Sequence, residues 1–174
     1  QQPLEAKEAV VAWGEEMDLI VCSGGDGTLN ETISGMMELK TMPQLGYIPA
    51  GSTNDFASSL KIPKQMAAAA LGVVKGELDP VDIGRFCKER YFVYVAGFGA
   101  FTEVSYLTSQ DKKNLLGHQA YMLEGVKSLA SIKAYPLRIE SQEQVYEGDF
   151  IFGMVTNTTQ VGGFKGLVSQ DVSL

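Results

Sequence analysis

The sequence is poor in cysteine, in histidine and in long apolar runs. Its two cysteines, Cys22 and Cys87, are not spaced in a way that predicts a disulfide, which favours a reducing, cytoplasmic setting. No apolar run approaches the ~20 residues that span a bilayer, and no signal peptide is visible. The one histidine, His118, is predicted at the surface or on the side of a helix, and not in catalysis.

Positive charge is also scarce. The 174 residues include 14 Lys and Arg against 21 Asp and Glu, a formal net charge of −7. Residues 1–80 hold 11 of these acids and only 5 of the bases. This balance disfavours nucleic-acid binding through a basic surface, and also purely electrostatic docking on anionic lipid. A hydrophobic content of 45% is enough for the core of one domain or of two small lobes.

Residues 1–80 alternate between helical and strand patterns. The run Leu19–Cys22 is wholly apolar, which is typical of a strand buried on both faces of a parallel sheet. Trp13 lies on the apolar stripe of the helix predicted over residues 4–16 and is assigned to the core. Strands alternating with helices in this order predict βαβ units. The remaining predictions for this part are a strand at 45–48 and helices at 29–37, 54–60 and 66–74.

The pattern changes after residue 80. Residues 81–174 are rich in β-branched and aromatic residues that alternate with polar ones, which predicts mainly antiparallel strands and one inserted helix. The strands are predicted over 91–96, 135–140 and 150–155, with a hairpin tip at 142–144 and a helix that reaches Ile132. The predicted fold class is therefore α/β. A parallel-sheet lobe (residues 1–80) is followed by a mostly antiparallel, β-rich lobe (residues 81–174).

The most informative stretch is the glycine-rich turn from Gly24 to Asn30. Its three glycines separate a predicted strand from a helix, so backbone N–H groups can approach a ligand closely. The helix adds its positive dipole end, which makes an anion site without a lysine, and no Walker P-loop pattern is present. The alternative is an ordinary β–α turn in which Asp26 or Thr28 caps the helix. Spacing alone leaves both interpretations open.

A second polar turn, Pro49–Ala57, follows the next predicted strand and opens a helix. In a parallel sheet, such turns lie together at the carboxyl ends of neighbouring strands, where ligands bind. Ser52, Thr53 and Asn54 are small hydrogen-bonding residues that could reach phosphates or a ribose. The alternative is that one of them caps the helix that starts at Asn54. Two such turns at one edge favour a ligand site over two unrelated turns.

The two turns together resemble the diacylglycerol kinase catalytic domain. The resemblance rests on Gly-Gly-Asp-Gly-Thr followed by Pro-x-Gly-Ser-x-Asn-Asp-Phe-Ala, and it continues through Ala96–Ala100, Asn157 and Gly162-Gly163-Phe164. The first motif is shared more loosely with NAD kinases and phosphofructokinases. The second discriminates, because NAD kinases usually have Asn-x-Gly-x-Leu-Gly-Phe there. The similarity covers most of the chain and implies a nucleotide-binding first lobe.

The resemblance implies an ATP-dependent kinase that phosphorylates the hydroxyl of diacylglycerol or a related lipid, with Mg²⁺ as cofactor. Asp26 is implied as the central acid near the Mg²⁺–phosphate cluster or the acceptor hydroxyl, and we expect it to matter more for turnover than for folding. The glycines are expected to provide close approach and positive φ. No residue is assigned as a metal ligand. The residues implied to hold the nucleotide are Gly24, Gly25, Asp26, Gly27, Thr28, Leu29, Asn30, Gly51, Ser52 and Asn54.

Several parts of the family pattern are not found between Gln1 and Leu174. The family's first strand would precede Gln1, and its Asp-Asp-Gly segment and general base would follow Leu174. We therefore expect a piece of a longer protein that is inactive by itself. Residues 158–160 replace the family's usual basic and aromatic residues, which weakens the match on the substrate side.

Two rival functions stay open at this stage. The chain could belong to a NAD kinase or another kinase of the superfamily, or it could be a non-catalytic nucleotide-binding module. The expected partners are ATP and a lipid substrate, met by transient peripheral contact with the membrane from the cytoplasm. No nucleic acid is expected, and a homodimer is left open.

Overall fold

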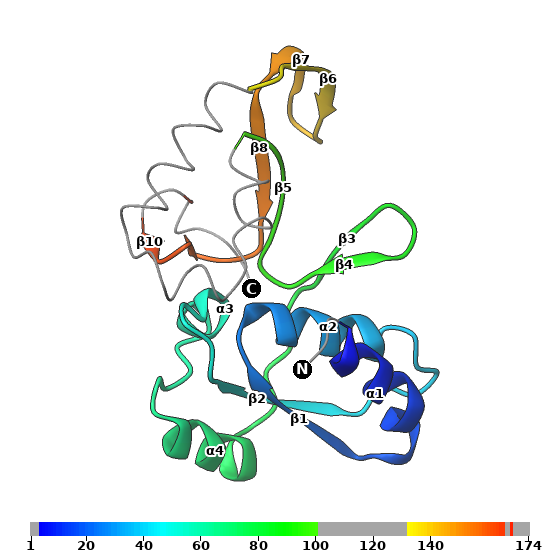
Figure 1. The fold of residues 1–174 in the computed structure, drawn as a ribbon, viewed down its shortest axis with the longest axis vertical. Helices are drawn as coiled ribbons and strands as arrows, with labels where there is room; N and C mark the ends of the chain where they lie inside the picture. Colours follow the sequence, from blue (N-terminus) through cyan, green and yellow to red (C-terminus); the bar gives the residue numbers. More distant parts are fainter. Residues whose placement is uncertain (1–3, 101–131, 166–167, 169–174) are drawn as a thin grey trace, which may run out of the picture. The chain divides into compact units, whose positions relative to one another are not determined.

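The computed structural model describes residues 4–100, 132–165 and 168 (Figure 1). The chain divides into two compact units. The first comprises Gln1–Val95 and Thr156–Leu174, and the second comprises Ala96–Val155. The chain therefore leaves the first unit after Val95 and returns to it after Val155.

This division differs from the predicted lobes, 1–80 and 81–174. Val81 and Ile83 pack against the core of the first unit, and Val93 lies fully buried within it. The change from helical to strand patterning at residue 80 therefore marks a change of secondary structure inside one compact unit.

The first unit contains a two-stranded parallel sheet. β1 (Leu19–Gly24) pairs with β2 (Gln44–Pro49), and α2 (Asp26–Met36) connects them, in the βαβ order that the sequence predicts. Cys22 and Tyr47 pack with α2 on one face of this sheet. The opposite face meets α4 (Met66–Lys75), because a Cβ built on Gly46 would lie 2.5 Å from the Val73 side chain.

The first helix, α1 (Glu5–Trp13), continues into a 3₁₀ turn, η1 (Gly14–Glu16), and packs against α2. The contact is close, since a Cβ on Gly35 would lie 2.8 Å from the Lys7 carbonyl oxygen. Val10 is the buried residue of this helix. The assignment of Trp13 to the core is wrong: its side chain is 62% exposed, because the contact with α2 encloses only a narrow stripe of α1.

The prediction that β1 is buried on both faces is also wrong. Leu19 and Val21 are 41% and 49% exposed, whereas Cys22 on the other face is buried. In the described part of the chain, β1 pairs only with β2, and α4 packs mainly against β2. The face of β1 that carries Leu19 and Val21 is therefore only partly covered.

The rest of the first unit is made of short elements. They are α3 (Asp55–Ser59), β3 (Gly84–Phe86), β4 (Arg90–Phe92), β9 (Gln160–Val161) and β10 (Phe164–Lys165). β3 with β4, and β9 with β10, form antiparallel pairs. The strand predicted over 91–96 is interrupted at Val93 and Tyr94, between β4 and β5.

The described part of the second unit is β-structure. β5 (Val95–Gly99) pairs with β8 (Phe152–Thr156), and β6 (Tyr135–Glu140) pairs antiparallel with β7 (Val145–Phe150). The predicted strand at 135–140 and the hairpin tip before Val145 are confirmed. His118 and the helix predicted to end at Ile132 lie outside the described residues, except for Ile132 itself. None of the helices within the described ranges is long and apolar enough to cross a membrane.

Candidate functional site

The two glycine turns meet at the carboxyl ends of β1 and β2. The Ala50 N–H donates to the Gly24 carbonyl oxygen at 2.9 Å. A Cβ built on Gly51 would lie only 2.4 Å from the Gly25 Cα. The turns are therefore in backbone contact, and glycine is needed at 51 for this approach. The expected positive φ is wrong here: Gly25 has φ −89°, and the glycines with positive φ in the described ranges are Gly99, Gly162 and Gly163.

Asn54 shapes the second turn. Its backbone is left-handed (φ 53°, ψ 54°), a conformation that asparagine tolerates better than most residues. Its Oδ1 accepts from the Gly51 N–H at 2.9 Å, and its Nδ2 donates to the Gly51 carbonyl at 2.7 Å. The side chain thus clamps Gly51 and makes no cap hydrogen bond to α3. The alternative in which Asn54 caps this helix is therefore wrong.

Asp26 provides the cap that Asn54 does not. Its Oδ2 accepts from the Asp55 N–H at 3.0 Å, and its Oδ1 accepts from the Phe56 N–H at 3.1 Å. A carboxylate suits this position, because the first N–H groups of a helix have no partner within the helix and carry partial positive charge. Asp26 therefore caps α3 from the first turn, and it does not cap α2, the helix to which it belongs.

The N-terminus of α2 differs from that of α3. Its N-cap residue is Gly25, which supplies no side-chain cap, and the Leu29 N–H donates to the Gly25 carbonyl at 3.0 Å. The N–H groups before Leu29, from Asp26 to Thr28, are those that a helix leaves without an internal partner. Gly27 is exposed, and a Cβ built on it meets no atom within 4 Å. An anion can therefore approach this turn of α2.

The other predicted residues fall into two groups. The side chains of Leu29 and Asn30 point into the protein: Leu29 is 1% exposed, and the Asn30 Oδ1 accepts from the Val93 N–H at 3.0 Å. Thr28 is half-buried, and its side chain lies against Gly24. Ser52 is exposed at the edge where the turns meet. Of the hydroxyl and amide side chains predicted to reach a ligand, Ser52 and Thr53 are exposed, whereas Thr28, Asn30 and Asn54 are partly buried.

Asp55 is a residue whose importance the sequence did not reveal. It is only 2% exposed, and its carboxylate accepts from the Gly162 N–H at 2.6 Å and the Gly163 N–H at 3.0 Å. The Gln160 Nε2 donates to the same carboxylate at 2.9 Å. Both glycines have positive φ, so their N–H groups converge on one acceptor. The signal in the sequence was the Asn-Asp-Phe motif together with the later Gly-Gly pair, but nothing in the spacing joined them.

Tyr47 forms a hydrogen bond to the backbone of the first turn. Its hydroxyl donates to the Gly24 carbonyl oxygen at 3.2 Å, and the residue is buried in the core. Burial, followed by the negative charge of Asp26, raises the pKa of Tyr47 above its ordinary value. The hydroxyl therefore stays protonated and remains a donor at neutral pH.

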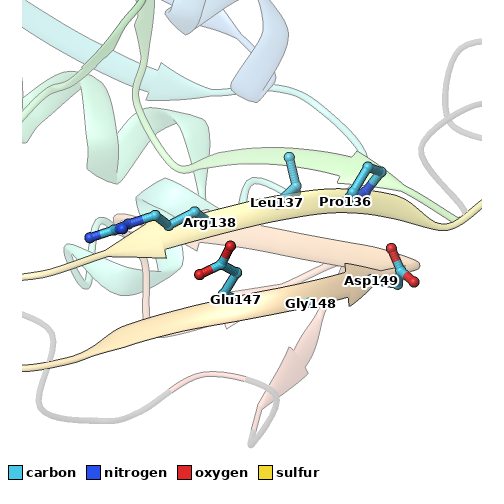
Figure 2. A pocket seen from close by; sticks show the side chains of 6 residues that line it. All are labelled: Pro136, Leu137, Arg138, Glu147, Gly148 and Asp149. Carbon is cyan, nitrogen blue, oxygen red and sulfur yellow. The ribbon is translucent and has the colours of Figure 1, made fainter.

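Outside the turns, the described residues show few groups suited to catalysis or metal binding. The described ranges contain no group of three or more His, Cys, Asp or Glu side chains that could hold a metal ion. Figure 2 shows a groove on the β6–β7 hairpin of the second unit, where Arg138 and Glu147 are opposite each other in the strand register. Arg138 forms an exposed ion pair with Glu140 at 3.0 Å. These charges are solvated, and we assign them no catalytic role.

A pair of alanine substitutions tests the contact between the turns. Gly51→Ala should lower the free energy of unfolding by about 1–3 kcal/mol, the usual cost of overpacking against fixed backbone. Gly27→Ala should leave it unchanged or raise it by up to about 1 kcal/mol, because Gly27 is helical and has open space around it. Urea denaturation of both variants measures the difference. Equal stability of the two would mean that the turns do not touch.

Comparison with known proteins agrees with the motif pair. Residues 1–86 match the family model of the diacylglycerol kinase catalytic domain. The chain is 41% identical over 163 residues to a diacylglycerol kinase of Bacillus subtilis, covering 93% of this chain and 52% of that protein. It is 38% identical over 161 residues to a diacylglycerol kinase of Staphylococcus aureus, covering 92% of this chain and 51% of that protein.

Solved structures give the same result. A crystal structure of a diacylglycerol kinase from Bacillus anthracis superposes with a TM-score of 0.71 at 30% identity, covering 95% of this chain and 54% of that one. The chain spans about half the length of the curated relatives that it matches. Motifs, sequence relatives and fold agree, and we conclude that the chain belongs to the diacylglycerol kinase catalytic-domain family.

Proposed function

We propose that this chain binds ATP for a lipid kinase, at the turn Gly25–Thr28, and that the acceptor is the hydroxyl of diacylglycerol or a related lipid. One observation supports the site above the others. Two helices begin at the shared edge of β1 and β2, and Asp26 occupies the N-terminus of α3 but leaves that of α2 open. Helix N-termini with unpartnered N–H groups are suited to phosphate.

The residues present fit a nucleotide phosphate chain. The N–H groups from Asp26 to Thr28 would bind phosphate oxygens, and the Ser52 hydroxyl lies exposed on the adjoining turn. The first 80 residues are acidic overall, so Lys and Arg side chains contribute little neutralisation there. Backbone N–H groups would supply part of it, as is common in phosphoryl-transfer enzymes.

Mg²⁺ also fits, in the form usual for nucleotide enzymes. No protein cage for a cation exists among the described residues, but Mg²⁺ in kinases is held mainly by phosphates, water and one or two carboxylates. Asp26 is the half-buried acid of this edge, and two N–H donors leave its carboxylate with unused lone pairs. When bound, the ion would neutralise charge on the transferred phosphoryl group.

For the acceptor, the proposal rests on the named relatives, which are diacylglycerol kinases. These relatives do not favour a NAD kinase. We propose that the first unit is the nucleotide-binding lobe and that the β-rich second unit belongs to the substrate side. Access to a lipid would require transient contact with a membrane surface.

Calorimetry and a chimera test this function. The chain should bind ATP–Mg²⁺. Gly27→Ala keeps the backbone N–H, but its added methyl group should push the phosphate away from one N–H donor and weaken binding at least ~10-fold, about the loss of one charge-assisted hydrogen bond. A chimera that carries this chain in place of the aligned 163 residues of the Bacillus subtilis kinase should phosphorylate diacylglycerol. Unchanged ATP affinity of Gly27→Ala would refute the phosphate site. A chimera that phosphorylates NAD and not diacylglycerol would refute the acceptor.

The 174-residue chain alone should show no lipid kinase activity, even with ATP and Mg²⁺. The acceptor hydroxyl must lose a proton as the phosphoryl group moves, and a positioned base normally takes it. The two ion pairs of the described residues, Lys7–Glu38 and Arg138–Glu140, lie outside the two turns, so neither of their carboxylates is placed to act as this base. The assay is transfer of labelled phosphate to diacylglycerol in mixed micelles, beside the Bacillus subtilis kinase. Comparable turnover by the chain would mean that its own residues include the base.

A further inference from the structure

The side chains of two asparagines bind the backbone of one buried residue. The Asn30 Oδ1 accepts from the Val93 N–H at 3.0 Å, and the Asn157 Nδ2 donates to the Val93 carbonyl at 3.1 Å. Val93 is fully buried, and it lies between β4 and β5 rather than within a strand. Leaving either backbone group unpaired would cost roughly 1–3 kcal/mol. We call Asn30, Val93 and Asn157 the amide brace.

The chemistry fixes the orientation of both amides. A carbonyl only accepts and an N–H only donates, so Asn157 must present its Nδ2 and Asn30 its Oδ1 to Val93. An aspartate at position 30 would keep the acceptor, whereas an aspartate at 157 would place a carboxylate oxygen against carbonyl oxygens. The two positions therefore respond oppositely to the same substitution.

Asn157 also joins the two connections of the chain between the units. Its own N–H donates to the Tyr94 carbonyl at 2.7 Å, and its Nδ2 also donates to the Asp82 carbonyl at 2.6 Å. Tyr94 directly precedes Val95, after which the chain leaves the first unit, and Asn157 follows Thr156, where the first unit resumes. One residue thus ties the outgoing segment to the returning one.

Asn30 extends this network to the phosphate turn. It lies on α2, two residues after Thr28, and the hydrogen-bonded helix links the two positions rigidly. A small shift of the α2 N-terminus is therefore passed to the Val93 N–H through a single hydrogen bond. The family resemblance implied that Asn30 holds the nucleotide, but its side-chain oxygen accepts from the Val93 N–H.

We propose that the amide brace couples occupancy of the α2 N-terminus to both chain connections between the units, with Asn30 and Asn157 as positioning residues. The proposal rests on the proposed function, because the ligand at α2 is the phosphate chain of ATP. Neither asparagine needs to touch ATP or the lipid for this role.

Amide hydrogen exchange of the wild-type chain tests the coupling without any substitution. ATP–Mg²⁺ should slow exchange of the Val93 N–H at least about fivefold, the lower end of typical coupling free energies. Asn30→Asp and the control Ser34→Ala, on the same helix, should keep this effect. Asn30→Ala should lose it while still binding ATP, and Asn157→Asp should accelerate Val93 exchange more than Asn157→Ala does.

Three results would overturn the proposal. The first is wild-type Val93 exchange that ATP binding leaves unchanged, and the second is an undiminished ATP effect in Asn30→Ala. The third is equal Val93 exchange, without ATP, in the wild type and Asn30→Ala, which would show that the brace itself does not hold. A wild-type chain that binds no ATP would instead contradict the proposed function, and with it the coupling, while the ATP-free exchange still reports on the brace.

Discussion

Asp55→Ala is expected to lower the free energy of unfolding by about 3 kcal/mol or more. Asp55 is buried and accepts from three donors, on Gln160, Gly162 and Gly163. Its loss leaves these donors without a partner, at roughly 1–3 kcal/mol for each that water cannot reach. The segment 160–163 would then lose these three hydrogen bonds to α3, while Thr158 and Thr159 would keep theirs to Ser59.

The measurement is urea denaturation of Asp55→Ala beside Asp79→Ala, an exposed acid of the first unit. The control should change stability by less than about 0.5 kcal/mol. If both variants unfold at the same urea concentration, the Asp55 carboxylate does not hold the 160–163 segment.

Asp26→Ala is expected to lower turnover of the active chimera at least ~10²-fold, an order typical of losing one electrostatic or proton-handling group. It should also lower the free energy of unfolding by about 1–2 kcal/mol, because α3 loses its cap. We therefore expect Asp26 to contribute to stability as a cap of α3 in addition to its larger expected effect on turnover.

Asp26→Asn separates the two roles. The amide oxygen can still accept from one N–H of α3, so most of the stability should remain, while the negative charge near the phosphates is lost. Turnover of both variants on diacylglycerol, measured together with their thermal unfolding, separates a role of the Asp26 charge in turnover from a role as a helix cap. Full turnover in Asp26→Asn would show that Asp26 is only a helix cap.

The meeting of the two glycine turns at one sheet edge could be predicted from the sequence. The apolar run at Leu19–Cys22, the order of elements and the two glycine turns implied a parallel pair of strands with both turns at one edge, and the structure confirms this. Such inferences succeed because they depend on local periodicity and on the direction of neighbouring strands.

The bonds between the turns could not be predicted in the same way. Asp26 and Asp55 lie 29 residues apart, and nothing local shows that one caps the helix of the other. Asn54 looked like a cap, but its left-handed backbone turns its side chain toward Gly51. Gly51 was predicted to lie close to a ligand, yet in the structure it lies close to Gly25. The spacing of residues in the sequence does not show whether a glycine makes room for a ligand or for a neighbouring backbone.

Solvent exposure was the other failure. Trp13 and Val21 belong to apolar patterns that are typical of buried positions, yet each is half-exposed or more. A periodic pattern indicates which face of an element is apolar, but burial depends on whether another element covers that face.

The central claim is that the open N-terminus of α2, and not the capped N-terminus of α3, binds the ATP phosphates. The most direct test is titration of the ¹⁵N-labelled chain with ATP–Mg²⁺, following backbone amide signals by NMR. We predict large shifts for Gly27 and Thr28, whose N–H groups are open, and small ones for Asp55 and Phe56, whose N–H groups Asp26 already holds. The largest shifts at Asp55 and Phe56, with Gly27 and Thr28 unmoved, would contradict the account.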